Sequence, residues 1–264
     1  MSVKKLVTRY SIRGGLFQKI KAKVHAVEDI SFTIMKGKTL SLVGESGCGK
    51  STVGRSLIRL VEPESGEVYL DGQNILDLTV KDVRDARSKI QMVFQDPFAS
   101  LNPRIKVGQV ITQGPIIQGL NRSTAEARAR ELLKIVGLDV RAFNRYPHEF
   151  SGGQRQRIGI ARALALDPEI LVADEPVSAL DVSIQAQILK LLDEIREKMN
   201  LSMVFITHDL RVAAQVCDRL AVMRYGEIVE TGATQELFKS PQHSYTRDLL
   251  AAVPGQKWDR QFAD

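Results

Sequence analysis

The feature that most constrains the fold is a short apolar run that leads into a glycine-rich turn and then into a helical pattern. Thr39–Val43 is a candidate buried strand. It continues into Gly44-Glu-Ser-Gly-Cys-Gly-Lys-Ser51, and a helix is expected from Ser51 to about Val61. A strand, a turn of this composition and a helix in this order match the pattern of a phosphate-binding loop, or P-loop.

Each residue type in this turn has a part in binding phosphate. Glycines let backbone N–H groups approach phosphate oxygens, and the following helix directs its positive end at the same charge. Lys50 adds a full positive charge, and the Ser51 hydroxyl is placed to ligate Mg²⁺. The alternative, a glycine-rich turn with an incidental Lys-Ser pair, is disfavoured by the flanking strand and helix. We expect MgATP to bind through Gly44, Ser46, Gly47, Cys48, Gly49, Lys50, Ser51 and Thr52.

Further apolar runs predict the rest of an α/β fold. Runs without alternation, separated by helical segments, indicate a parallel sheet covered on both faces. Two earlier β-rich runs, Ala26–Ile34 and Glu67–Leu70, stand before turn signals and are expected to form a small antiparallel sheet. The strands expected in the parallel sheet are Ile90–Phe94, Ile170–Ala173, Met203–Ile206, Arg219–Met223 and Glu227–Glu230.

Helical patterns fill the remaining chain. The stretch from Pro97 to Phe150 interrupts the strand–helix alternation and is interpreted as an inserted helical lobe. Within it, Ser123 and Glu126 form a capping-box pattern that opens a helix, which Gly137 is expected to close. The domains predicted are a P-loop NTPase (RecA-like) core of residues 1–96 and 151–240, which includes the antiparallel β subdomain, a helical subdomain of residues 97–150, and a C-terminal tail of residues 241–264.

Two acids follow a buried strand directly. Asp174 and Glu175 come after Ile170–Ala173, and in an open parallel sheet ligands bind at the carboxyl ends of strands. Asp174 then suits the role of holding Mg²⁺, and Glu175 is the candidate to polarise the attacking water. The alternative is that the two acids belong to a solvent-exposed turn before Pro176. Because the chain also carries a phosphate loop, the catalytic role is favoured.

The segment Ser151-Gly-Gly-Gln154 resembles the signature of the ABC ATPase family, which stands shortly before the acidic strand. A serine hydroxyl and glycine amides at a helix N-terminus form a second phosphate cradle. In this family two cassettes form a head-to-tail dimer, so the resemblance implies that Ser151, Gly152, Gly153 and Gln154 complete the ATP site of another subunit. It also implies that Asp181, in the segment Ser178-Ala-Leu-Asp181, belongs to a loop at the dimer interface. Asp181 is further expected to be the N-cap of a helix.

Two more residues take roles from the same resemblance. Gln95 follows the strand Ile90–Phe94 and matches the glutamine that reaches the Mg²⁺ and the attacking water. His208 follows Met203–Ile206 and matches the histidine that contacts the γ-phosphate. An aromatic residue that stacks on adenine is also expected, and the spacing leaves Tyr10, Phe17 and His25 as candidates.

Three segments are similar to the ATPases of dipeptide, oligopeptide and nickel importers: Val93–Pro103, Tyr146–Gln154 and Ser240–Leu250. This similarity implies transmembrane permease subunits, a substrate-binding protein and a second ATPase, which is a paralogue or a second copy. It places the chain at the cytoplasmic face of the inner (plasma) membrane as a peripheral subunit. Some relatives carry a cysteine-containing extension; here no iron–sulfur cluster is expected.

Composition fits these interpretations and removes others. The 264 residues carry a net charge of +6, with basic residues scattered and not interleaved with aromatics, so nucleic-acid binding is not expected. Two cysteines, far apart, suggest neither a disulfide framework nor a zinc site. An exporter or lipoprotein-release ATPase remains an alternative that shares every motif. A chromosome-organising or DNA-repair ATPase would need a longer insertion, and a non-catalytic regulator would not need Glu175 and His208.

Overall fold

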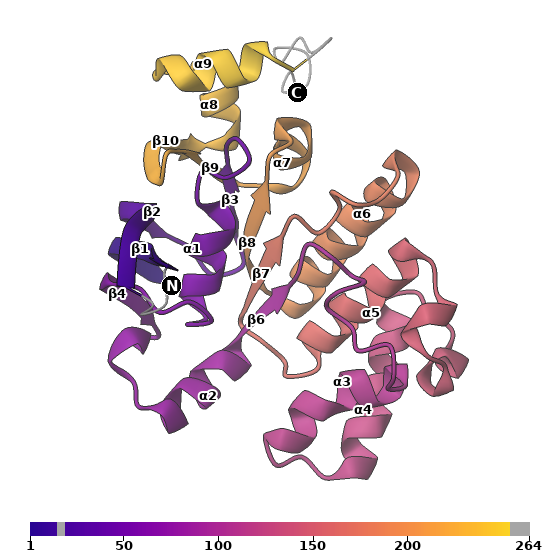
Figure 1. Cartoon of the computed structure of the whole chain (residues 1–264). Helices are drawn as coiled ribbons and strands as arrows, with labels where there is room; N and C mark the ends of the chain where they lie inside the picture. The colour runs from indigo at the N-terminus through magenta and orange to yellow at the C-terminus, as the bar shows by residue number, and fades with distance from the viewer. Residues whose placement is uncertain (15–18, 254–264) are drawn as a thin grey trace. The chain divides into compact units, whose positions relative to one another are not determined.

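The computed structural model describes residues 1–14 and 19–253. The chain divides into two compact units (Figure 1). The first unit comprises residues 1–83 and the chain from residue 203 onward, and the second comprises residues 84–202. The helix α2 (Val80–Lys89) contains the boundary between them.

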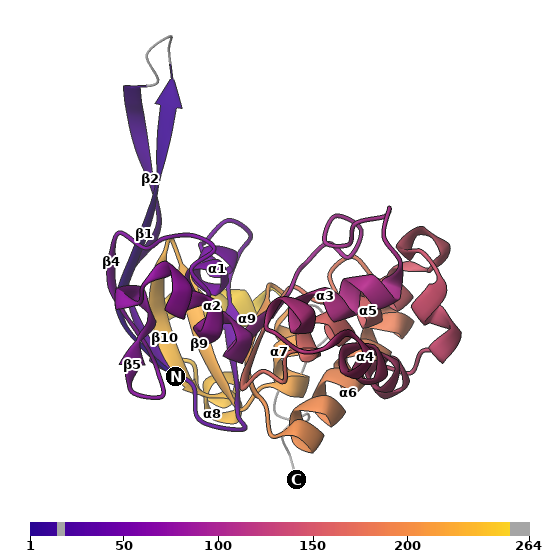
Figure 2. The same cartoon turned by 90° about the horizontal axis from the view of Figure 1, so that it is seen from below.

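The first unit contains an antiparallel sheet with the strand order β2-β1-β4-β5. Its strands are β1 (Ser2–Gly14), β2 (Lys19–Thr33), β4 (Ser65–Leu70) and β5 (Gln73–Asn74). The antiparallel sheet is as predicted, but β1 was not among the expected strands. Since β4 pairs with β1 only as far as Val7, the rest of β1 and β2 forms a two-stranded ribbon that extends past its own sheet (Figure 2).

A second sheet of this unit carries the phosphate loop. Strand β3 (Thr39–Val43) has the predicted bounds and runs parallel to β8 (Ser202–Thr207) and β9 (Arg219–Arg224). The strand β10 (Glu227–Ala233) pairs antiparallel with β9, so its predicted place in a parallel sheet is wrong. The physical reason is the connection: only Tyr225 and Gly226 join the two strands, which is too short for a crossover.

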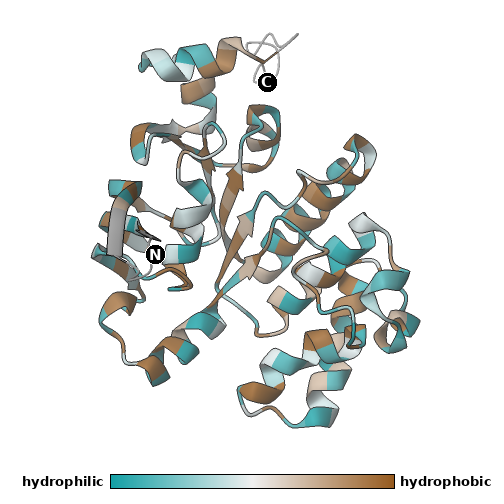
Figure 3. Ribbon diagram, in the orientation of Figure 1, coloured by the Kyte–Doolittle hydropathy of each residue, from teal (hydrophilic) through white to brown (hydrophobic). Residues whose placement is uncertain are grey.

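Burial explains why β3 and β8 lack alternation. Every residue of both strands is buried, and β8 is largely hydrophobic in Figure 3. One face packs against α7 (Leu210–Val216), α8 (Thr234–Lys239) and α9 (Ser244–Ala251) in a single apolar cluster. The helix α1 (Lys50–Leu57) follows the phosphate loop and ends four residues before the expected end at Val61. Arg59, two residues after its last residue, adopts a positive φ of 51°, which is not helical.

The second unit contains a parallel strand pair and a helical segment. The pair consists of β6 (Ile90–Val93) and β7 (Ile170–Asp174). The helices are α3 (Val107–Ile117), α4 (Arg122–Ile135), α5 (Gly152–Leu164) and α6 (Val182–Met199). Two short 3₁₀ helices, η2 (Val140–Asn144) and η3 (Pro147–Glu149), lie between α4 and α5 in the chain. A third 3₁₀ helix, η1 (Ile75–Asp77), belongs to the first unit.

The helix α4 ends as predicted but begins differently. Gly137 follows its C-terminus with a positive φ of 73°. The N-cap is Asn121, whose Oδ1 accepts the backbone N–H of Thr124 at 2.9 Å, so the predicted capping box of Ser123 and Glu126 is wrong. The Ser123 hydroxyl instead donates to the same Asn121 oxygen at 2.8 Å, because Asn121 stands earlier in the chain and is itself a strong cap.

Candidate functional site

The phosphate loop begins directly at the end of β3, and its shape requires glycine. Gly49 has a φ of 108° and forms the N-cap of α1. A Cβ atom there would lie 2.1 Å from the carbonyl oxygen of Ala26, and residues with a side chain rarely adopt this φ. The turn of residues 45–47 is exposed, so a ligand can reach the loop from solvent.

Lys50 is held inside the loop. Its side chain is buried, and Nζ donates to the carbonyl oxygens of Gly44 at 2.8 Å and Glu45 at 2.7 Å. Its third contact, at 3.6 Å, is with Sγ of the buried Cys48. A thiol sulfur is a weak acceptor, so this third N–H is the one that a phosphate oxygen can take over. Ser51 and Thr52 follow on the first turn of α1.

His208 lies at the same edge of the sheet as the phosphate loop. Thr207, at the end of β8, pairs with Val43, at the end of β3, so the residues that follow both strands are neighbours in the sheet order. The turn around His208 is fixed by the Thr207 hydroxyl, which accepts the backbone N–H of Asp209 at 3.0 Å. The Asp209 carboxylate in turn caps α7.

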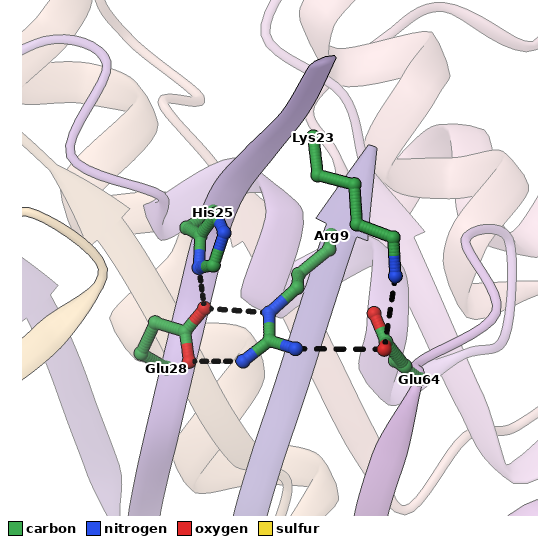
Figure 4. A network of polar contacts seen from close by, with 5 residues as sticks. All are labelled: Arg9, Lys23, His25, Glu28 and Glu64. Atoms are coloured by element: carbon green, nitrogen blue, oxygen red, sulfur yellow. Dashed lines mark hydrogen bonds and ion pairs between the residues drawn. The ribbon is translucent and has the colours of Figure 1, made fainter. Parts of the chain in front are cut away.

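The aromatic candidates for adenine differ in their surroundings. The Tyr10 hydroxyl lies 3.4 Å from Oγ1 of Thr52, beside the phosphate loop, and the ring is partly exposed. His25 pairs with Arg9, the neighbour of Tyr10 in β1, so its ring lies on the opposite face of the β1–β2 ribbon from Tyr10. There it contacts Glu28 (Figure 4). Phe17 lies outside the described residues. Between Tyr10 and His25, the geometry therefore favours Tyr10.

In the second unit, Gln95 and Glu175 lie at matching positions beyond two neighbouring strands. Val93 of β6 pairs with Ala173 of β7, and each of the two residues stands two positions later. Nε2 of Gln95 donates to Oε2 of Glu175 at 3.0 Å. Asp174, the last residue of β7, is almost completely buried.

The backbone at Glu175 adopts an uncommon conformation. Its φ is +45°, in the left-handed region that costs a residue with a side chain about 1 to 2 kcal/mol. The turn after it holds this conformation: the backbone N–H and the hydroxyl of Ser178 both donate to the Glu175 carbonyl oxygen, at 3.3 and 3.1 Å.

The oxygen donors of the expected magnesium site suit the ion. Hydroxyl, carboxylate and amide oxygens are ligands that Mg²⁺ accepts, and the sequence predicts one of each, from Ser51, Asp174 and Gln95. With its amide nitrogen turned to Glu175, Gln95 presents Oε1 as the group that can ligate.

Ser151 starts α5 and forms a reciprocal cap with Gln154. The Ser151 backbone N–H donates to Oε1 of Gln154 at 3.1 Å, and the Gln154 N–H donates to the Ser151 hydroxyl at 3.4 Å. Gly152 and Gly153 occupy the first turn, where amides have no acceptor within the helix. Gly153 also has a packing role, since a Cβ there would lie 2.5 Å from Cγ2 of Ile184 on α6.

Asp181 is the N-cap of α6, as predicted. Its Oδ1 accepts the backbone N–H of Ile184 at 3.0 Å and the Ser183 hydroxyl at 2.6 Å. These hydrogen bonds, that of Ser183 first, lower the pKa of the Asp181 carboxyl below its usual range. The carboxylate therefore stays charged at neutral pH.

Comparison with known proteins identifies the family. The family model for the ABC transporter matches residues 27–178, which is more than half of the chain. The chain belongs to the ABC transporter family. Its cassette is 53% identical over 237 residues to the oligopeptide transport ATP-binding protein OppF of Bacillus subtilis, covering 89% of this chain and 78% of that protein.

Other relatives of this ABC cassette are longer. It is 51% identical over 255 residues to the glutathione import ATP-binding protein GsiA of Pectobacterium atrosepticum. The aligned region covers 96% of this chain but only 41% of that protein. Among solved structures, the cassette matches the dimeric post-hydrolysis state of the ATP-binding cassette MJ0796 bound to ADP and Pi. That match has a TM-score of 0.77 and 31% identity, covering 88% of this chain and 98% of the other.

The structure thus brings the predicted residues of the ABC cassette into two groups, one in each unit. The phosphate loop, Tyr10 and His208 form the first group. Gln95, Asp174 and Glu175 form the second, while Ser151 and Asp181 cap the helices α5 and α6. Sequence reasoning missed one contact of the loop, made by Tyr245, because the residues involved lie 200 positions apart and nothing local marks the pair.

Proposed function

We propose that this chain is the ATP-hydrolysing subunit of an ABC importer for peptides or similar small solutes. The observation that carries the proposal is the phosphate loop. Its turn of residues 45–47 is exposed, and the helix after it is capped at Gly49, where only glycine fits. The buried Lys50 makes its weakest contact with the thiol of Cys48. The importer class is supported by relatives named for oligopeptide transport and glutathione import. Among the described residues no helix is both long and apolar enough to cross a bilayer.

In this proposal the loop amides and Lys50 bind the triphosphate of ATP, and the adenine stacks on Tyr10. Ser51, Asp174 and Gln95 are the residues that would hold Mg²⁺, which would supply positive charge against the charge that develops on the phosphates. Glu175 accepts a hydrogen bond from the attacking water, and Gln95 orients the carboxylate through the contact at 3.0 Å. His208 contacts the γ-phosphate.

The signature explains why two cassettes are needed. Ser151, Gly152 and Gly153 form a second anion cradle at the N-terminus of α5. We assign this cradle to the ATP bound by another cassette, which is a paralogue or a second copy. Since ATP then bridges two subunits, nucleotide binding favours the closed dimer and hydrolysis reopens it. Asp181 lies at that interface, and permease subunits at the cytoplasmic face of the inner membrane receive the motion.

The Glu175→Gln variant tests this function. Replacing the carboxylate removes the group that accepts the proton of the attacking water, so turnover should fall roughly 10²- to 10⁴-fold while ATP binding remains. Dimers held together by ATP should then persist in gel filtration. Turnover close to that of the wild type would refute the role of Glu175.

A further inference from the structure

A tyrosine from the C-terminal helix contacts the phosphate loop. Tyr245, in the first turn of α9, is buried, and its hydroxyl accepts the backbone N–H of Glu45 at 3.3 Å. The carbonyl oxygen of the same Glu45 accepts Nζ of Lys50 at 2.7 Å. One peptide residue of the loop is therefore held from both sides, by Tyr245 at its N–H and by Lys50 at its carbonyl.

The position of Tyr245 is itself fixed from the sheet. The Glu230 carboxylate on β10 accepts the backbone N–H groups of Gln242 and His243, at 2.7 and 3.1 Å, which anchors the start of α9. Nδ1 of His243 then accepts the backbone N–H of Tyr245 at 3.2 Å. The ring of Tyr245 packs into the apolar cluster that covers the parallel sheet.

One cation also lies over this ring. The guanidinium of Arg224, at the end of β9, is 4.7 Å from the Tyr245 ring centroid and 5.0 Å from that of the exposed Tyr225. Burial raises the pKa of the Tyr245 hydroxyl, so the hydroxyl stays protonated, and a lone pair of its oxygen accepts the loop N–H.

We propose that Tyr245 is a positioning residue of the phosphate loop, which holds the turn of residues 45–47 in its anion-binding shape before ATP arrives. The residues of that turn are exposed, and a Cβ atom at Gly47 would meet no atom within 4 Å. A loop whose amides already point at the ligand loses less conformational entropy on binding, which raises affinity. The inference rests on the proposed role of Gly44–Ser51 as the ATP phosphate site.

The Tyr245→Phe variant tests this proposal, because it keeps the ring and its packing and removes only the hydroxyl. Losing the net contribution of one hydrogen bond should raise the Kd for ATP roughly three- to tenfold in a calorimetric titration. The kcat should stay within about twofold, since the contact stabilises bound substrate and transition state alike. Tyr225→Phe is the matched control, because it changes the other tyrosine beside Arg224 and should leave Kd unaltered.

A second measurement reports the loop directly and needs no nucleotide. In a Cys217→Ser background Cys48 is the only thiol, and it is buried within the loop. Alkylation of Cys48 by N-ethylmaleimide should be several-fold faster when Tyr245→Phe is added, and unchanged when Tyr225→Phe is added. A merely structural role of Tyr245 would instead lower the melting temperature and leave the rate of Cys48 alkylation in the folded protein unaltered.

The outcomes separate this inference from the proposed function. If Lys50→Ala abolishes ATP binding while Tyr245→Phe changes neither Kd nor Cys48 alkylation, the positioning role is refuted and the phosphate site stands. If Lys50→Ala binds ATP like the wild type, the phosphate site and the role of Tyr245 are both overturned. An equal rise of Kd in Tyr225→Phe would also contradict the role of Tyr245.

Discussion

At the scale of single residues, two glycines of the phosphate loop differ in how much space surrounds them. Gly49 faces the Ala26 carbonyl of β2, whereas a Cβ at Gly47 would meet no atom within 4 Å. Both glycines have a positive φ, of 108° and 83°. The two positions therefore separate the cost of backbone strain from the cost of steric overlap.

Alanine substitutions at these two glycines should destabilise the protein by different amounts. Gly47→Ala adds only strain, about 1 to 2 kcal/mol. Gly49→Ala adds the overlap with the Ala26 carbonyl as well, a further ~1 to 3 kcal/mol. Urea unfolding followed by circular dichroism measures both values, and equal losses in the two variants would contradict the steric account.

The chemical types of the site residues could be predicted from the sequence, but their contacts could not. The order of glycines before Lys50 and Ser51 already implies a phosphate site. The contact between Gln95 and Glu175 depends on the pairing of β6 with β7, whose strands lie 80 residues apart. The positive φ of Glu175 likewise depends on the turn that follows it, since no property of glutamate predicts it.

At the scale of elements, the β1–β2 ribbon is held at its base by ion pairs. Arg9 makes two hydrogen bonds to Glu28, at 2.8 and 2.9 Å, and reaches Glu64 at 3.4 Å; Lys23 and His25 contact the same two acids (Figure 4). A two-stranded ribbon alone is marginally stable in water, so these contacts fix its base. The Arg9 hydrogen bond, followed by that of His25, lowers the pKa of Glu28 to about 2.

This pKa predicts how ribbon stability depends on pH. Because the folded-state pKa of Glu28 lies below the ordinary glutamate value of 4.5, the charged carboxylate stabilises the fold above pH 4.5, and this contribution is lost as the pH falls toward 2. Glu28→Gln should therefore lower the melting temperature at pH 7, and the difference from the wild type should shrink between pH 4.5 and 2. Glu194→Gln, at an exposed and longer ion pair of 3.9 Å, is the control. A constant difference across that range would rule out this linkage.

Elements were predicted where local pattern and tertiary environment agree. The strand β3 is uniformly buried, so its apolar run marks it fully. The strand β1 was missed because its alternation is broken: Lys5 has a positive φ of 47°, and the pairing with β2 shifts register around it. In the same way, β10 resembles a buried parallel strand in sequence, and only its two-residue connection to β9 reveals the antiparallel edge.

At the scale of the whole molecule, family and fold class were predictable because several motifs occur in one order along the chain. The match to the ABC transporter family and the likeness to solved cassettes confirm both. The solute of the proposed importer could not be predicted from this chain, since selectivity is expected in other subunits. The Tyr245 contact could not be predicted either, because it joins the loop to a helix near the other end of the chain.

In the proposed dimer, each ATP is bound by the phosphate loop of one cassette and the Ser151 cradle of another. The decisive experiment is a structure of the Glu175→Gln variant with MgATP and its partner cassette. The triphosphate is expected on the amides of residues 44–52 of one subunit, with its γ-phosphate also bound by Ser151 and Gly153 of the facing subunit. An ATP molecule enclosed by a single protomer, with Gly152 and Gly153 turned to solvent, would contradict it.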